Sequence, residues 1–149
     1  MTTRLARSLV LSLSALAPAA SGQVCSMLAV DQEGTLADGG RLTFDVTGSR
    51  PDAFVVLAVS KALGTSCVPV GMMQEVCLDV DLEQALVLPI GQTDTAGGLE
   101  LAIDLPPAPK ALPPAEPVHF QVVSFVLDTT WFVPVMDVCV SNVVSGTLE

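Results

Sequence analysis

Three carboxylates in one short stretch are the residues of this sequence that come closest to chemistry. Asp79, Asp81 and Glu83 stand two positions apart in "VCLDVDLE" (76–83), behind Cys77. Carboxylate oxygens are ligands that Ca²⁺ prefers in proteins. On a strand, however, residues two apart are separated by about 6.5–7 Å, too far for consecutive side chains to hold one ion without a turn or a neighbouring strand. We therefore expect a solvated strand face, with a calcium site as the alternative.

A second acidic segment, "TDTAGG" (93–98), has the composition of a turn. Asp94 can accept backbone N–H bonds in an Asx-turn while a following glycine takes positive φ, which explains the residues without a ligand. The sequence thus predicts no cofactor and leaves Ca²⁺ as the candidate metal. Its ligands would be Asp79, Asp81 and Asp94, supplied by neighbouring strands and turns.

Catalytic chemistry has little support in the sequence. A nucleophile-and-base site needs a histidine or a substitute base, and the single histidine, His119, lies beside Phe120 in a strand pattern without a G-x-S-x-G motif. We expect a satisfied or partly exposed strand histidine. Glycosidases usually line their clefts with aromatic residues, whereas this chain has no tyrosine and one tryptophan. We therefore predict no enzyme activity and no catalytic residue, with a hydrolase as the least favoured alternative.

Trp131 and Phe132 are the remaining candidates for a binding site. They follow the turn-like "LDTT" and fit either an exposed binding patch or, more commonly for such residues, packing in a core or loop.

The four cysteines predict two disulfides. Their number is even, which is typical of exported chains, although three pairings are possible. Cys67 and Cys77 flank a short loop that contains a proline and a glycine, so we expect them to pair locally. Cys25 would then join Cys139 and tie the first strand to a late one. A zinc site lacks support because the chain has no Cys-x-x-Cys spacing and one histidine.

Residues 1–22 have the three-part form of a secretory signal peptide. Two arginines precede the apolar run 9–17, and the small residues of "APAASG" follow it. The run is shorter than the ~20 residues needed to cross a bilayer, and no later segment is a second candidate. We expect cleavage near Gly22, which leaves residues 23–149 as a single domain outside the cytoplasm, extracellular or periplasmic, without a membrane span.

The exported chain is strongly acidic. The formal charge of −10 becomes −12 when the two arginines of the signal are removed. Such an excess of acid repels nucleic acid, so we expect an unidentified protein or surface as the partner. Lipid attachment at Cys25 is disfavoured, because Val24 before it is not the small residue that a lipidation signal needs.

Hydrophobic alternation with period two predicts strands along residues 23–149. Segments 41–46 and 98–105 alternate regularly, whereas 53–60 and 119–127 are apolar on both faces, as expected of central strands. Further strands are expected at 23–30, 76–83, 85–90, 131–140 and 142–148. The proline-rich segment 106–114 is expected to cross between two sheets. The sequence thus predicts an all-β fold, an antiparallel immunoglobulin-like β-sandwich of about seven to nine strands stapled by disulfides.

From residue 54 onward the order of features resembles a group of uncharacterised secreted proteins of planctomycete-like bacteria. The resemblance rests on "FVVLAVS", on "TDTAGG" followed by "LELAIDLPP", on "VHFQVVSFVLD", and on Ser141 and Asn142 before the last apolar strand. It implies a small exported β-sandwich, and it brings no known activity and no catalytic residues.

These observations favour a non-enzymatic exported module that acts as a structural or binding component. A calcium-dependent adhesive or matrix domain is the alternative.

Overall fold

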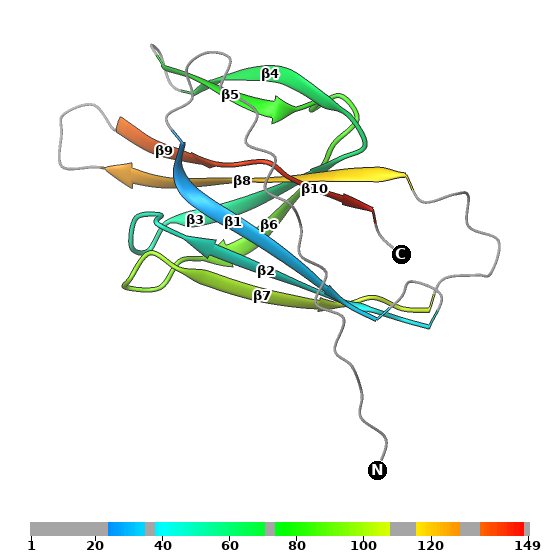
Figure 1. Ribbon diagram of the computed structural model, residues 1–149. Helices are drawn as coiled ribbons and strands as arrows, with labels where there is room; N and C mark the ends of the chain where they lie inside the picture. Colours follow the sequence, from blue (N-terminus) through cyan, green and yellow to red (C-terminus); the bar gives the residue numbers. More distant parts are fainter. Residues whose placement is uncertain (1–23, 35–37, 71–73, 108–115, 129–134, 148–149) are drawn as a thin grey trace.

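The computed structural model describes residues 24–34, 38–70, 74–107, 116–128 and 135–147. These residues form ten β-strands and no helix (Figure 1). The strands are β1 (Val24–Glu33), β2 (Arg41–Thr47), β3 (Phe54–Ser60), β4 (Leu63–Val70), β5 (Gln74–Val80), β6 (Leu86–Gln92), β7 (Leu99–Asp104), β8 (Pro117–Asp128), β9 (Val135–Ser141) and β10 (Val144–Thr147). In the described part of the chain, no helix has the length and apolar character of a membrane span.

The predicted all-β fold is confirmed, with one strand more than expected. The additional strand is β4, "LGTSCVPV", in which Gly64 and Pro69 interrupt any period-two pattern. It forms because it pairs with β5 in an antiparallel hairpin. Residues 131–134, with Trp131 and Phe132, lie outside the described part of the chain, as does 108–114 of the proline-rich segment.

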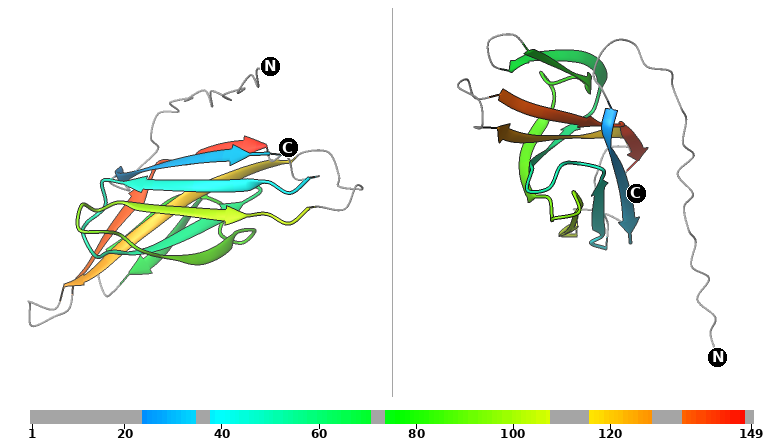
Figure 2. Two further views of the ribbon diagram at one scale, coloured as in Figure 1. Left: turned by 90° about the horizontal axis from the view of Figure 1, so that it is seen from below. Right: turned by 90° about the vertical axis from the view of Figure 1, so that its left-hand side faces the viewer.

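Eight strands form one sheet, seven of them in the order β6-β3-β8-β9-β1-β2-β7. The eighth, β10, pairs with the first residues of β8 (117–120), whereas β9 pairs with its later residues (123–128). The pairs are antiparallel apart from β1 with β9, which is parallel. The edge strands β6 and β7 also contact each other, so the sheet coils until it is nearly closed. Figure 2 shows β1, β2 and β7 side by side as one layer, with β8 and β3 crossing behind them. This arrangement is compatible with the predicted β-sandwich, while the immunoglobulin-like subtype stays a prediction.

The main hydrophobic core lies between the two layers. Phe44 on β2 and Phe120 on β8 meet edge to face, with ring centroids 5.5 Å apart. The other buried members of this core are Leu28, Val30, Leu42, Val46, Val55, Leu57 and Val122. Burial of one such side chain stabilises the fold by about 1.5–3 kcal/mol, so this core supplies the main driving force for folding.

The β4–β5 hairpin packs on the outer face of β3 and β8 and forms a third layer. Leu78 and Val80 of β5 meet Ala58 of β3 there, and Val123 of β8 packs against them. Strands β3 and β8 therefore bury apolar residues on both faces over part of their length. This explains the apolar runs at 53–60 and 119–127 and confirms that both strands are central.

A β-bulge joins β9 to β10 and links the two layers. Val140 pairs with Val123, whereas Val144 pairs with Phe120, so three residues (141–143) face two on β8. In this bulge, Asn142 Oδ1 accepts a hydrogen bond from the Leu28 N–H at 2.7 Å, and its Nδ2 donates to the Leu28 carbonyl at 3.2 Å. The amide side chain thus takes the part of a backbone neighbour for β1.

Candidate functional site

The carboxylates of "VCLDVDLE" do not share one strand. Val76, Leu78 and Val80 are buried against the sheet while Asp79 points to solvent, as predicted. Strand β5 ends at Val80, however, so the prediction of a strand over 81–83 is wrong.

The physical reason is an Asx-turn at Asp81. Its Oδ1 accepts the Glu83 backbone N–H and its Oδ2 accepts Gln84 Nε2, both at 3.0 Å. A side chain that binds the backbone two residues ahead favours a turn over an extended strand. Both oxygens of Asp81 therefore have a local structural role.

Asp94 forms the Asx-turn that the sequence predicts. Its Oδ1 accepts the backbone N–H of Ala96 at 2.8 Å and of Gly98 at 2.9 Å, and Gly97 takes a φ of 80°. These hydrogen bonds favour the charged carboxylate, so the Gly98 and then the Ala96 N–H hold the pKa of Asp94 below its ordinary value of 3.8.

The structure does not bring Asp79, Asp81 and Asp94 together. Among the described residues, the group of candidate ligands dense enough for a metal ion consists of Cys67, Glu75 and Cys77 instead. Its two sulfurs are joined in a disulfide and offer no thiolate. The positions of the three aspartates therefore give calcium binding no support.

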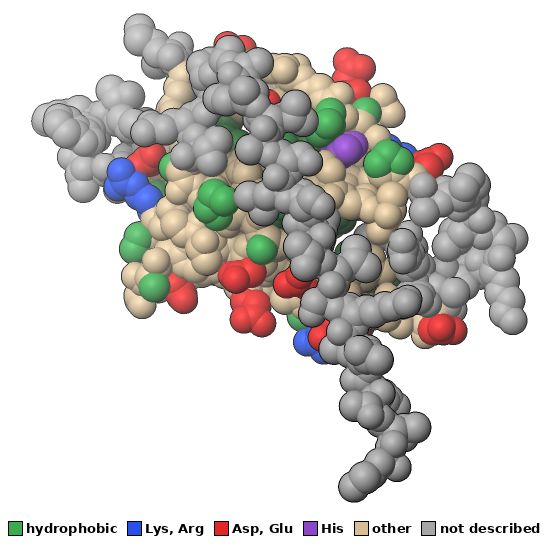
Figure 3. All heavy atoms as spheres, in the orientation of Figure 1, with side chains coloured by type: hydrophobic (Ala, Val, Ile, Leu, Met, Phe, Trp, Pro, Cys, Tyr) green, Lys and Arg blue, Asp and Glu red, His purple; other side chains and the backbone are tan. Residues whose placement is uncertain are grey.

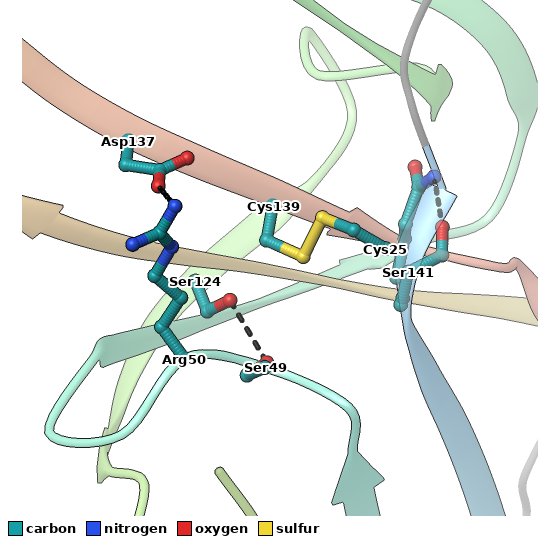
Figure 4. The surroundings of a disulfide bond; sticks show 8 residues. Cys25, Ser49, Arg50, Ser124, Asp137, Cys139 and Ser141 are labelled. Carbon is teal, nitrogen blue, oxygen red and sulfur yellow. Dashed lines mark hydrogen bonds and ion pairs between the residues drawn. A yellow bond between two sulfur atoms is a disulfide. The ribbon is translucent and has the colours of Figure 1, made fainter.

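Both predicted disulfides are confirmed. Cys67 and Cys77 lie directly opposite each other in the β4–β5 hairpin, with Cα atoms 4.0 Å apart. Cys25 and Cys139 join β1 to β9, with Cα atoms 5.4 Å apart (Figure 4). In the chain-entropy model, closing a loop as long as the one between Cys25 and Cys139 stabilises the fold by about 4–5 kcal/mol. This bond therefore fixes the short parallel pairing of β1 with β9.

Polar contacts surround the disulfide between β1 and β9. Figure 4 shows Ser49 facing Ser124, with their hydroxyl oxygens 2.9 Å apart, and Arg50 reaching Asp137 in a 2.5 Å ion pair. Ser26 is buried nearby, and its hydroxyl has no hydrogen-bond partner among the described residues. The contacts of the other four side chains hold the loop before β3 against β8 and β9.

His119 has a structural environment in keeping with a satisfied strand histidine. It is 8 % exposed, and its Nδ1 lies 2.7 Å from Ser145 Oγ, its direct neighbour across β8 and β10. The bond satisfies one ring nitrogen and links the two strands, which explains how a polar ring is accommodated in a buried position.

The outer side of β1, β2 and β7 is acidic. Its outward carboxylates, here called the acidic face, are Asp31, Glu33, Asp45, Glu100 and Asp104. Asp45 and Glu100 stand directly opposite each other. Figure 3 shows acidic side chains gathered over β2 and β7. Arg41 is paired with Asp104 at 3.6 Å, so the acidic face keeps an excess of negative charge.

The opposite outer side carries an uncharged surface. Phe54, Val87 and Leu127 are 52 %, 51 % and 55 % exposed, and Phe54 stacks on Phe125 with ring centroids 5.8 Å apart. The strand registers place them with neighbours on β3, β6, β8 and β9 in one surface, here called the apolar face: Phe54, Val56, Val87, Pro89, Phe125, Leu127, Met136 and Val138. A contiguous exposed apolar surface on a folded protein commonly marks an interaction site.

Sequence reasoning missed the apolar face, although its signal was present. The apolar runs at 53–60 and 119–127 predict strands covered on both sides. The β4–β5 hairpin covers the end of this sheet that holds Ala58 and leaves the end with Phe54 and Leu127 in solvent.

Comparison of the chain with protein-family models, curated proteins and solved structures finds no match. A proposal of function therefore rests on the surface and geometry of this chain.

Proposed function

We propose that the protein is an exported, non-enzymatic module that acts outside the cytoplasm as a structural or binding component and makes its contacts through the apolar face. The observation that carries the proposal is the pair of contrasting outer surfaces. In a strongly acidic chain, one outer side concentrates carboxylates, whereas the apolar face combines half-exposed Phe54, Val87 and Leu127 with no charged side chain. Exposed apolar residues of this kind lower solubility, so we infer that they are covered by a partner.

Export is supported by two independent features. Residues 1–22 have the form of a signal peptide, and two disulfides are typical of proteins in oxidising compartments. A disulfide within the β4–β5 hairpin and a second one between β1 and β9 suit a module that must stay folded outside the cell.

A role without catalysis is supported by what the reactive side chains do. Asp81 and Asp94 shape turns, and His119 links two strands. These three side chains, which the sequence singles out for their chemistry, thus have structural roles. A calcium-dependent adhesive domain would need Asp79, Asp81 and Asp94 on one site, and their positions do not favour it.

Retention on the envelope of the producing cell tests this proposal. The labelled exported chain is compared with Phe54→Asp and with Met27→Asp as a matched control. Met27 is 51 % exposed, nearly as much as Phe54, but it lies on the outer side of β1, with the acidic face. Thermal unfolding confirms that all three proteins fold.

We expect saturable retention of the wild type and Met27→Asp, and at least tenfold weaker retention of Phe54→Asp, because a carboxylate would have to be buried in the contact. Equal retention of all three proteins would contradict a role for the apolar face. Turnover of ester or glycoside substrates by the wild type would contradict the non-enzymatic role.

A further inference from the structure

We infer that the apolar face binds a second copy of the same chain, in a weak dimer that forms as ionic strength rises. The inference rests on the proposed function of this face and names its partner.

Charge selects the face through which two copies can meet. The exported chain has a formal charge of −12, and contact through the acidic face would bring Asp45 and Glu100 of one copy against carboxylates of the other. The basic residues in the described part of the chain, Arg41, Arg50 and Lys61, are already in ion pairs. The apolar face has no charged member, so two copies can pack there without burying a carboxylate.

The sheet edge beside this face is protected against strand addition. β6 is an edge strand without a charged residue, but Pro89 lacks an N–H, and its pairing with β3 is interrupted by a bulge next to Val56. Proline and bulges are devices that prevent edge-to-edge pairing. Association is therefore expected face to face, with the side chains of Phe54 and Val87 in the contact.

The size of the apolar face predicts a weak dimer. Four neighbouring strands about 4.8 Å apart span roughly 14 Å, and two or three outward residues per strand give a surface on the order of a few hundred Å². Stable interfaces bury about 800 Å² on each partner. Association through this face should therefore be reversible and concentration dependent.

Ionic strength regulates such a dimer because charge repulsion, which opposes it, and apolar contact, which favours it, respond differently to salt. Repulsion between two acidic chains acts over about 10 Å at 0.1 M salt and about 3 Å at 1 M. Apolar contact is not weakened by this screening, and sulfate strengthens it. Added salt should therefore promote the dimer, whereas a contact between charged surfaces of opposite sign would weaken.

Sedimentation equilibrium of the oxidised exported chain tests the inference over about 10 μM to 1 mM protein, at low salt and at about 0.5 M sodium sulfate. We expect the mean mass to rise toward that of a dimer with concentration and with salt. Phe54→Asp should weaken association at least tenfold at each salt concentration. Met27→Asp, which adds the same charge elsewhere, should associate within about twofold of the wild type at high salt.

Three results would overturn the inference: a monomer under all conditions, association that weakens with salt, or equal weakening by the two variants. Binding of a monomeric wild type to zwitterionic lipid vesicles would also overturn it and point to a lipid surface. If the wild type is monomeric but Phe54→Asp still loses retention on the cell envelope, the inference that the partner is a second copy is wrong and the proposed function stands. If retention is also unaffected, both are wrong.

Discussion

Replacement of Gln121 by leucine tests whether one buried amide ties three parts of the fold together. Gln121 is buried on β8. Its Oε1 accepts the Asp79 backbone N–H on β5 at 2.9 Å, and its Nε2 donates to the Ser141 carbonyl in the bulge at 3.0 Å. Leucine has a similar volume but makes neither bond. Both backbone groups would therefore lose their partner while the packing is largely kept.

We expect Gln121→Leu to lower the free energy of unfolding by about 1–5 kcal/mol. A buried backbone donor or acceptor without a partner costs about 1–3 kcal/mol, and two such groups are created. The more favourable burial of leucine offsets about 1 kcal/mol of this. For a domain of this length, about 4 °C per kcal/mol converts the loss into a fall in Tm of about 4–20 °C.

Urea unfolding followed by circular dichroism measures this loss, with Gln92→Leu as the control. Gln92 is exposed on β6, so the same substitution there should change the free energy of unfolding by less than about 0.5 kcal/mol. Hydrogen exchange should show faster exchange of the Asp79 amide in Gln121→Leu. A variant within about 0.5 kcal/mol of the wild type would refute the reasoning.

Three further substitutions test local features. Gly97→Ala should lower the free energy of unfolding by about 2–4 kcal/mol in urea melts, because Gly97 has a φ of 80° and a Cβ would overlap the Ser49 carbonyl; a loss under about 0.5 kcal/mol contradicts this. Ser26→Ala should raise it by about 1 kcal/mol, because the buried hydroxyl has no partner among the described residues; a destabilised variant contradicts that. Since hydrogen bonds lower the pKa of Asp94, its charge stabilises the fold above its ordinary pKa of 3.8, and this contribution is lost as pH falls below that value. The stability difference between the wild type and Asp94→Asn should therefore be present at pH 5 and vanish on acidification in melts at a series of pH values; a difference independent of pH would contradict the assignment.

Much of the strand pattern could be predicted because it depends on local alternation. β2 and β7 each have one face in the core and one in water, so 41–46 and 98–105 alternate regularly. β4 escaped prediction because its formation depends on pairing with β5. The predicted disulfide between Cys25 and Cys139 already placed β1 near β9. The parallel direction of their pairing was out of reach, because it depends on contacts between residues far apart in the sequence, including the Asn142 bridge to Leu28.

Among the candidate sites, too, those with a local sequence signal could be predicted and those that depend on contacts in the folded chain could not. The turn at Asp94 has its glycines as a signal, and it was predicted. The turn at Asp81 has no glycine or proline, and alternation continues through it, so only the hydrogen bonds of the folded chain reveal it. Gln121 is a polar residue inside the apolar run 119–127. That position could have signalled a buried hydrogen-bonding role, although its partners could not be read from the sequence.

Oxidative footprinting of side chains tests most directly which face of the protein makes contacts. Hydroxyl radicals modify exposed phenylalanine, leucine and methionine, so Phe54, Leu127 and Met27 report on the two outer sides in one experiment. The oxidised protein, residues 23–149, is labelled free and again when bound to the cell envelope. We expect lower reactivity of Phe54 and Leu127 in the bound protein, with Met27 unchanged. Protection of Met27, with Phe54 and Leu127 as reactive as in the free chain, would contradict it.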